Sequence, residues 1–63
     1  MYTLHVHYPG QSAPAESRHA RSGPEALELV PKLLADHPQC ERVVVMAGAA
    51  HLFAVDRKGA RLG

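Results

Sequence analysis

The sequence predicts an α+β fold, a two-layer sandwich with one helix on one face of a mainly antiparallel sheet of three or four strands, in the order β-(β)-α-β-β. Three observations predict it. Residues 2–8 alternate between apolar and polar side chains, residues 22–36 combine a helix start with helical spacing, and residues 42–56 contain two apolar runs joined at a glycine. A chain of 63 residues has room for one domain, which we place over residues 1–63.

The first strand is predicted from its alternation, because a strand sends successive side chains to opposite faces. One face would carry Tyr2, Leu4, Val6 and Tyr8, and the other Thr3, His5 and His7. Residues 9 and 10, a Pro-Gly pair, end this strand. Residues 16–21 leave two interpretations open, a long loop or a short polar strand. We favour a strand at a sheet edge, since long structureless connections are uncommon and charge protects an edge from aggregation.

The helix start is the clearest local signal. Ser22 and Glu25 have the spacing of a capping box, in which each residue can bond the backbone N–H of the other, and Pro24 suits the first turn. Apolar residues then recur at helical spacing and predict the face that meets the sheet: Ala26, Leu27, Val30, Leu33 and Leu34. His37 precedes Pro38, and the residue before a proline disfavours helical geometry, so the helix should end there.

Pro31 is the anomaly of this helix. An interior proline removes a backbone hydrogen bond and clashes with the carbonyl four residues back, at a cost of about 3 kcal/mol. We therefore expect a kink at Pro31 or a break into two short segments.

Residues 40–47 and 50–56 predict two further strands joined by a tight turn at Gly48-Ala49. Both strands are apolar on both faces, whereas a sheet with one solvated face should alternate. We expect Phe53, Val55 and His51 to face the helix and Leu52 and Ala54 to face away, with Asp56. Residues 56–59 are turn-like, and residues 60–63 form a short tail.

One helix covers one face of the sheet, so the other apolar face needs a partner. A small domain of this kind has a marginal core, and self-association is a common remedy. The sequence therefore predicts a homodimer, formed through the sheet face that carries Val44, Val45, Met46, Leu52 and Ala54.

The composition of the chain indicates its cellular compartment. Cys40 is the single cysteine, which rules out an internal disulfide and is typical of a reducing cytoplasm. The first residues lack the basic and apolar regions of a signal peptide, and no apolar run reaches membrane-spanning length. We expect a cytoplasmic protein without a membrane partner.

Chemical motifs are weak throughout. His5 and His7 lie two apart on one strand face and could share a metal ion, but no further ligand has a diagnostic spacing, so we expect no metal. Cys40 leads into a valine strand and reads as an inert apolar thiol, and the glycine at 48 lacks the lysine of a phosphate-binding loop. We expect neither a cofactor nor an enzymatic activity.

Two functions remain open. The first is a non-enzymatic interaction or regulatory protein that acts as a homodimer and binds a protein partner. The alternative is a small nucleic-acid-binding protein, although the net charge is only +1. Its phosphate contacts would come from Arg18, Arg21, Arg57 and Lys58. No signature motif of a known family is present.

Overall fold

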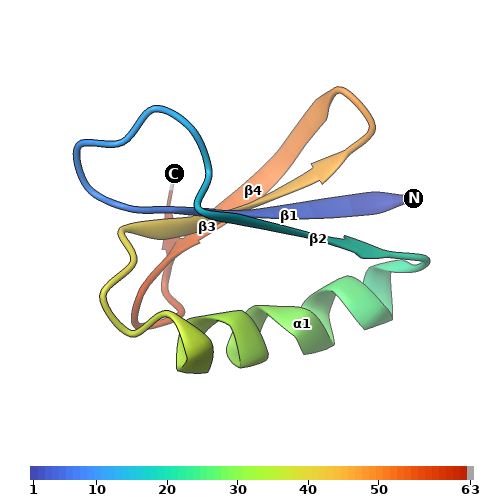
Figure 1. Cartoon of the computed structure of the whole chain (residues 1–63). Coiled ribbons are helices and arrows are strands. Elements are labelled where there is room, and N and C mark those ends of the chain that lie inside the picture. Colours follow the sequence, from blue (N-terminus) through green and yellow to red (C-terminus); the bar gives the residue numbers. More distant parts are fainter. Residues whose placement is uncertain (63) are drawn as a thin grey trace.

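The computed structural model describes residues 1–62 and has one helix packed on a five-stranded antiparallel sheet (Figure 1). This architecture confirms the predicted α+β class, with one strand more than expected. The elements are β1 (Tyr2–His7), β2 (Glu16–Ala20), α1 (Gly23–Asp36), β3 (Arg42–Ala47), β4 (Ala50–Asp56) and β5 (Arg61–Leu62). Within residues 1–62, no helix is long and apolar enough to cross a membrane.

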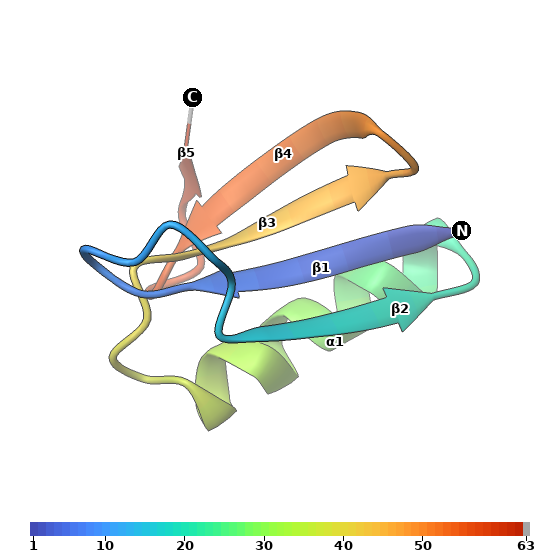
Figure 2. The same ribbon diagram turned by 45° about the horizontal axis from the view of Figure 1, so that its top comes forward.

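The strands lie in the order β2-β1-β3-β4-β5, so the first strand of the chain occupies an inner position (Figure 2). β2 forms one edge, which confirms the edge strand favoured for residues 16–21. At the other edge, Arg61 and Leu62 pair with Val55 and Ala54, so part of the predicted tail is a strand. The tail folds back because the Asp56 carboxylate accepts hydrogen bonds from the backbone N–H groups of Lys58 and Ala60, which fixes the turn. The last residue of the predicted tail, Gly63, lies outside the described residues.

The helix begins as its sequence predicts. The Ser22 side chain accepts the predicted hydrogen bond from the Glu25 N–H at 3.3 Å. The Glu25 carboxylate accepts one from the Arg21 N–H at 3.2 Å, in place of the predicted bond to the Ser22 N–H. α1 then runs through Pro31 as one segment, which confirms a single helix and excludes the alternative of a break into two. Pro31 lies on the exposed side, where water can bond the carbonyl that its missing N–H leaves free.

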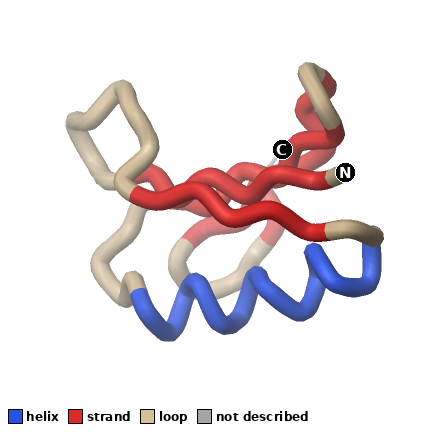
Figure 3. Tube along the Cα trace, turned by 45° about the vertical axis from the view of Figure 1, so that its right-hand side comes forward, coloured by secondary structure: helices blue, strands red, loops and turns tan. Residues whose placement is uncertain are grey.

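One face of α1 packs on the sheet, and the two layers enclose the core (Figure 3). From the helix, Ala26 and Leu33 are fully buried, and Leu29 packs beside them. Leu27, predicted to face the sheet, is instead 60% exposed. Leu27 is exposed because α1 is displaced toward one side of the sheet. The helix backbone lies against β1, β2 and β3 and does not come close to the backbone of β4 (Figure 2).

The hairpin of β3 and β4 contains a bulge, which changes the side of the sheet on which two β4 side chains lie. Gly48 adopts φ 60° in a two-residue turn, and Met46 pairs with His51 as such a turn requires. The next pair is Val45 with Phe53, which leaves Leu52 without a partner in the ladder. An extra residue on one strand shifts the alternation by one position. Leu52 therefore lies on the helix side beside Phe53, and His51 lies on the opposite face, which corrects both predictions.

Candidate interaction surfaces

The sheet face away from α1, which we call the outer face, gathers four of the five histidines of the chain. β1 contributes His5 and His7, β2 contributes His19 opposite Thr3, and β4 contributes His51 opposite Met46. The His5 and His7 rings lie 6.3 Å apart, and His5 Nδ1 is 2.8 Å from the Ser17 hydroxyl. The alternation of β1 thus lines one strand with imidazoles, and the bulge in β4 adds His51 to them.

The apolar side chains at the centre of the outer face are largely buried. Val44 and Ala54 are only 9% and 6% exposed. A shallow groove of about 590 Å³ crosses this face and is lined by His7, Arg42, Val44, His51, Ala54 and Leu62. Polar rings and an arginine therefore share this surface with apolar side chains, among them Leu62.

The five residues predicted to form one dimer surface are divided between two faces. Val44, Met46 and Ala54 belong to the outer face. Val45, 1% exposed, packs in the core beneath the helix, and Leu52 lies on the helix side. Strand alternation separates Val45 from its neighbours, and the bulge moves Leu52. These five residues therefore cannot form a single surface, and the predicted placement is corrected.

A second surface, the α1–β4 groove, lies on the helix side where the helix leaves β4 uncovered. It encloses about 220 Å³ between the first turns of α1 and the start of β4. Its lining is largely apolar: Tyr2, Gly23, Ala26, Leu27, Val45, Leu52, Phe53 and Arg61. Leu27 and Leu52, which are 60% and 48% exposed, are prominent among the large apolar side chains left to solvent. The Arg61 guanidinium stacks 4.5 Å from the centre of the Phe53 ring and covers part of it.

The same region has an open strand edge. β5 pairs only with Ala54 and Val55, so within residues 1–62 no strand pairs with residues 50–53 on the side away from β3. An unpaired edge offers backbone donors and acceptors to another chain. Apolar side chains and free backbone groups therefore occur together beside the α1–β4 groove.

The four basic residues of the nucleic-acid alternative do not form one surface. Arg18 lies on edge strand β2 and is paired with Glu16, and Arg21 follows that strand at the end of the sheet where β1 begins. Arg57 and Lys58 occupy the turn after β4, at the end where β1 finishes.

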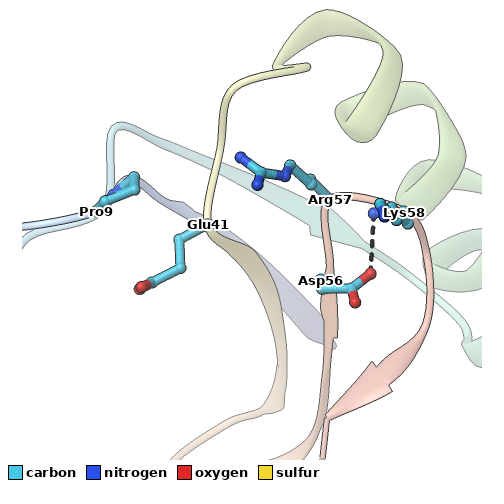
Figure 4. Close-up of a pocket in the computed structure, with 5 residues that line it drawn as sticks. All are labelled: Pro9, Glu41, Asp56, Arg57 and Lys58. Carbon is cyan, nitrogen blue, oxygen red and sulfur yellow. Dashed lines mark hydrogen bonds between the residues drawn. The ribbon is translucent and has the colours of Figure 1, made fainter.

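A cleft of about 380 Å³ lies at the turn after β4 and is lined by Pro9, Glu41, Asp56, Arg57 and Lys58 (Figure 4). Glu41 and Asp56 line the same cleft as the two basic residues, and their negative charges weaken any attraction for a phosphate. The Asp56 carboxylate is already engaged by the Lys58 backbone N–H, the contact dashed in Figure 4.

The geometry of the described residues gives little support for a metal site or for a reactive thiol. Among residues 1–62, no three histidine, cysteine, aspartate or glutamate side chains converge on a point that could hold a metal ion. Cys40 is fully buried, and burial raises the pKa of its thiol above the ordinary value. A thiol of that kind is a poor nucleophile near neutral pH.

One polar cluster escaped sequence analysis. The Tyr8 hydroxyl is 2.8 Å from His37 Nδ1, and His37 Nε2 is 2.6 Å from a Glu16 carboxylate oxygen. Glu16 also bonds Arg18, and together the hydrogen bonds hold the pKa of Glu16 below its ordinary value, with His37 as the main cause. The members are far apart in the chain, so no spacing reveals them. Because their polar groups satisfy one another, the cluster ties three segments together and leaves no group directed at a ligand.

Comparison of the chain with protein-family models, with curated proteins and with solved structures finds no match.

Proposed function

We propose that this chain is a small non-enzymatic interaction protein of the cytoplasm, and that it acts as a homodimer joined through the α1–β4 groove. One observation carries the proposal, the exposure of Leu27 and Leu52 on either side of an apolar hollow. Leucines left to solvent beside such a hollow are typical of an interaction surface. The single buried thiol of Cys40 supports the cytoplasmic location.

A second copy is the occupant that this shape favours. A two-fold contact uses the same patch on both partners, so the patch must offer both a projection and a hollow. The α1–β4 groove offers both within one small area, since Leu52 projects next to the hollow that it lines. Leu52 of one copy can then enter the groove of the other, and the reverse contact follows by symmetry.

The free energy of such a contact is large relative to the stability of the fold. Complete burial of a leucine side chain contributes about 1.5–3 kcal/mol, and Leu27 and Leu52 retain roughly half of their area for this purpose. Four such side chains, two from each copy, contribute on the order of several kcal/mol before association costs. The core of a domain this small supplies only about 3–5 kcal/mol by itself.

Backbone pairing can add to the contact. Residues 50–53 of β4 present an unpaired edge next to the groove. Two such edges related by a two-fold axis run antiparallel, which is the geometry for strand addition. This contribution needs no particular side chain and would orient the two copies.

The test is the molar mass in solution of three variants, measured by sedimentation equilibrium at micromolar concentration. Leu52→Asp places a charge in the contact, and Leu27→Glu does the same from the helix surface with a residue that helices accept. Leu62→Asp is the matched control, because Leu62 is 41% exposed but lies on the outer face.

We expect a dimer for the original chain and for Leu62→Asp, and monomers for the two groove variants. Circular dichroism checks that each variant is folded, and Leu27→Glu decides the result if Leu52→Asp unfolds. A folded monomer of the original chain would overturn the proposal. Dissociation by Leu62→Asp alone would move the dimer contact to the outer face.

A further inference from the structure

The outer face carries several side chains whose charge depends on pH in the mildly acidic range. Four imidazoles, those of His5, His7, His19 and His51, are distributed over three neighbouring strands. An unperturbed imidazole gains its proton near pH 6.5. Histidine is the side chain that gains its charge in mild acid, so the positive charge of this surface should rise as the pH falls.

Three other charged groups lie on or beside this face. β3 contributes Arg42, opposite both His7 and Asp56, and β4 contributes Asp56. The Asp56 carboxylate accepts two backbone hydrogen bonds within its turn, and Glu41 at the rim lies 3.8 Å from Arg42. β2 adds only the hydroxyl of Ser17 beside His19, and β5 adds the apolar side chain of Leu62. In mild acid Arg42 adds to the charge of the imidazoles, and the carboxylates of Asp56 and Glu41 oppose it.

We propose that the outer face is an acid-dependent binding surface for a phosphate polyanion, with His5, His7, His51 and Arg42 as the main contacts. Charge complementarity carries the assignment, because a row of phosphates matches positive side chains spread over adjacent strands. The groove lined by His7, Arg42 and His51 gives the polyanion a path across the sheet. This surface is opposite the α1–β4 groove, so the inference is independent of the proposed dimer.

The environment of His7 supports this assignment. Burial lowers the pKa of His7, the neighbouring charges of Arg42 and His5 lower it further, and the carboxylate of Glu41 opposes them in part. Such a site resists protonation while it is empty, and a bound phosphate supplies the negative charge that offsets the repulsion. Polyanion binding and protonation of His7 should therefore favour each other.

The test measures binding of a fluorescent oligothymidylate of about 20 nucleotides by anisotropy at about pH 7.5 and pH 5.5. Thymine does not titrate in this range, so the change reports on the protein. We expect binding at least about tenfold tighter at the lower pH and weakened by added salt. Inorganic polyphosphate as a competitor separates the two sources of phosphate. Equal competition shows recognition of phosphate alone, and weaker competition shows that bases also stack on the imidazoles.

Two variants locate the site. His5→Gln, His7→Gln and His51→Gln combined remove three of the four imidazoles of the outer face, and we expect them to abolish most of the gain in affinity at low pH. The matched control, Arg18→Gln with Arg21→Gln, removes two full charges elsewhere and should retain that gain. Circular dichroism at both pH values confirms that each variant is folded. Equal binding at both pH values, retention of the gain by the histidine variant, or its loss in the arginine control would overturn the proposal.

Discussion

The hydroxyl of Tyr8, just beyond the end of β1, lies 2.8 Å from Nδ1 of His37, the residue that caps the C-terminus of α1. Their rings meet edge to face, with centroids 5.8 Å apart. The backbone N–H of His37 also donates to the Leu33 carbonyl, so His37 both ends the helix and attaches it to the sheet. The other ring nitrogen contacts Glu16 at the start of β2. This arrangement, which we call the Tyr8–His37–Glu16 latch, fixes the helix end relative to two strands.

Loss of the Tyr8 hydroxyl should weaken the latch. Tyr8→Phe keeps the ring and removes one partly buried hydrogen bond, so we expect unfolding free energy to fall by about 1 kcal/mol. Urea denaturation measures the change. Tyr2→Phe is the matched control, since the Tyr2 hydroxyl makes no side-chain hydrogen bond within residues 1–62 and its loss should have little effect. Equal destabilisation by both substitutions would contradict a specific role for the latch.

Acid should open the same latch through Glu16. The hydrogen bonds from His37 and Arg18 lower the pKa of Glu16 in the folded state from its ordinary value of 4.5. The unfolded chain then binds the proton more tightly, so this stabilisation is complete above about pH 4.5 and is lost as pH falls through the lowered value. The unfolding free energy of the original chain should therefore decrease as the pH is lowered below about 4.5. The slope should be reduced in Glu16→Gln, and an unchanged slope would assign acid sensitivity to other groups.

Pro31 tests the cost of a proline inside α1. Pro31→Ala restores a backbone N–H, but the position is exposed and the helix is continuous, so water can bond the freed carbonyl. We expect the substitution to raise unfolding free energy by a small amount, well below the ~3 kcal/mol of an interior proline. Urea denaturation of the two chains measures the gain. A gain near the full amount would show that the helix derives no benefit from the proline.

Metal ions should leave stability unchanged. His5 and His7 share a face, but no third ligand converges on them within residues 1–62. A ligand that binds only the folded chain raises its melting temperature by mass action. We expect no rise with near-stoichiometric zinc or nickel, measured by differential scanning calorimetry. A saturable rise that His5→Ala removes would establish a site.

The sequence by itself determined each local element that short-range chemistry controls. Alternation over residues 2–8 predicted β1 and both of its faces, because a strand has a period of two whatever it packs against. Ser22 and Glu25 predicted the start of α1, because capping is complete within four residues. The same local rules placed His5 and His7 together on one face.

Only the tertiary structure decided where these elements meet. The lateral position of α1 depends on the packing of all layers, and it leaves Leu27 exposed and β4 uncovered, which no helical spacing reveals. A single unpaired residue, Leu52, exchanged the faces of Leu52 and His51, because a bulge responds to sheet twist and long-range pairing rather than to local sequence. Tyr8 and His37 are 29 residues apart and meet because the sheet order brings the end of β1 to the end of the helix. Contacts of this kind arise from the whole fold, so they cannot be obtained from any one segment of the chain.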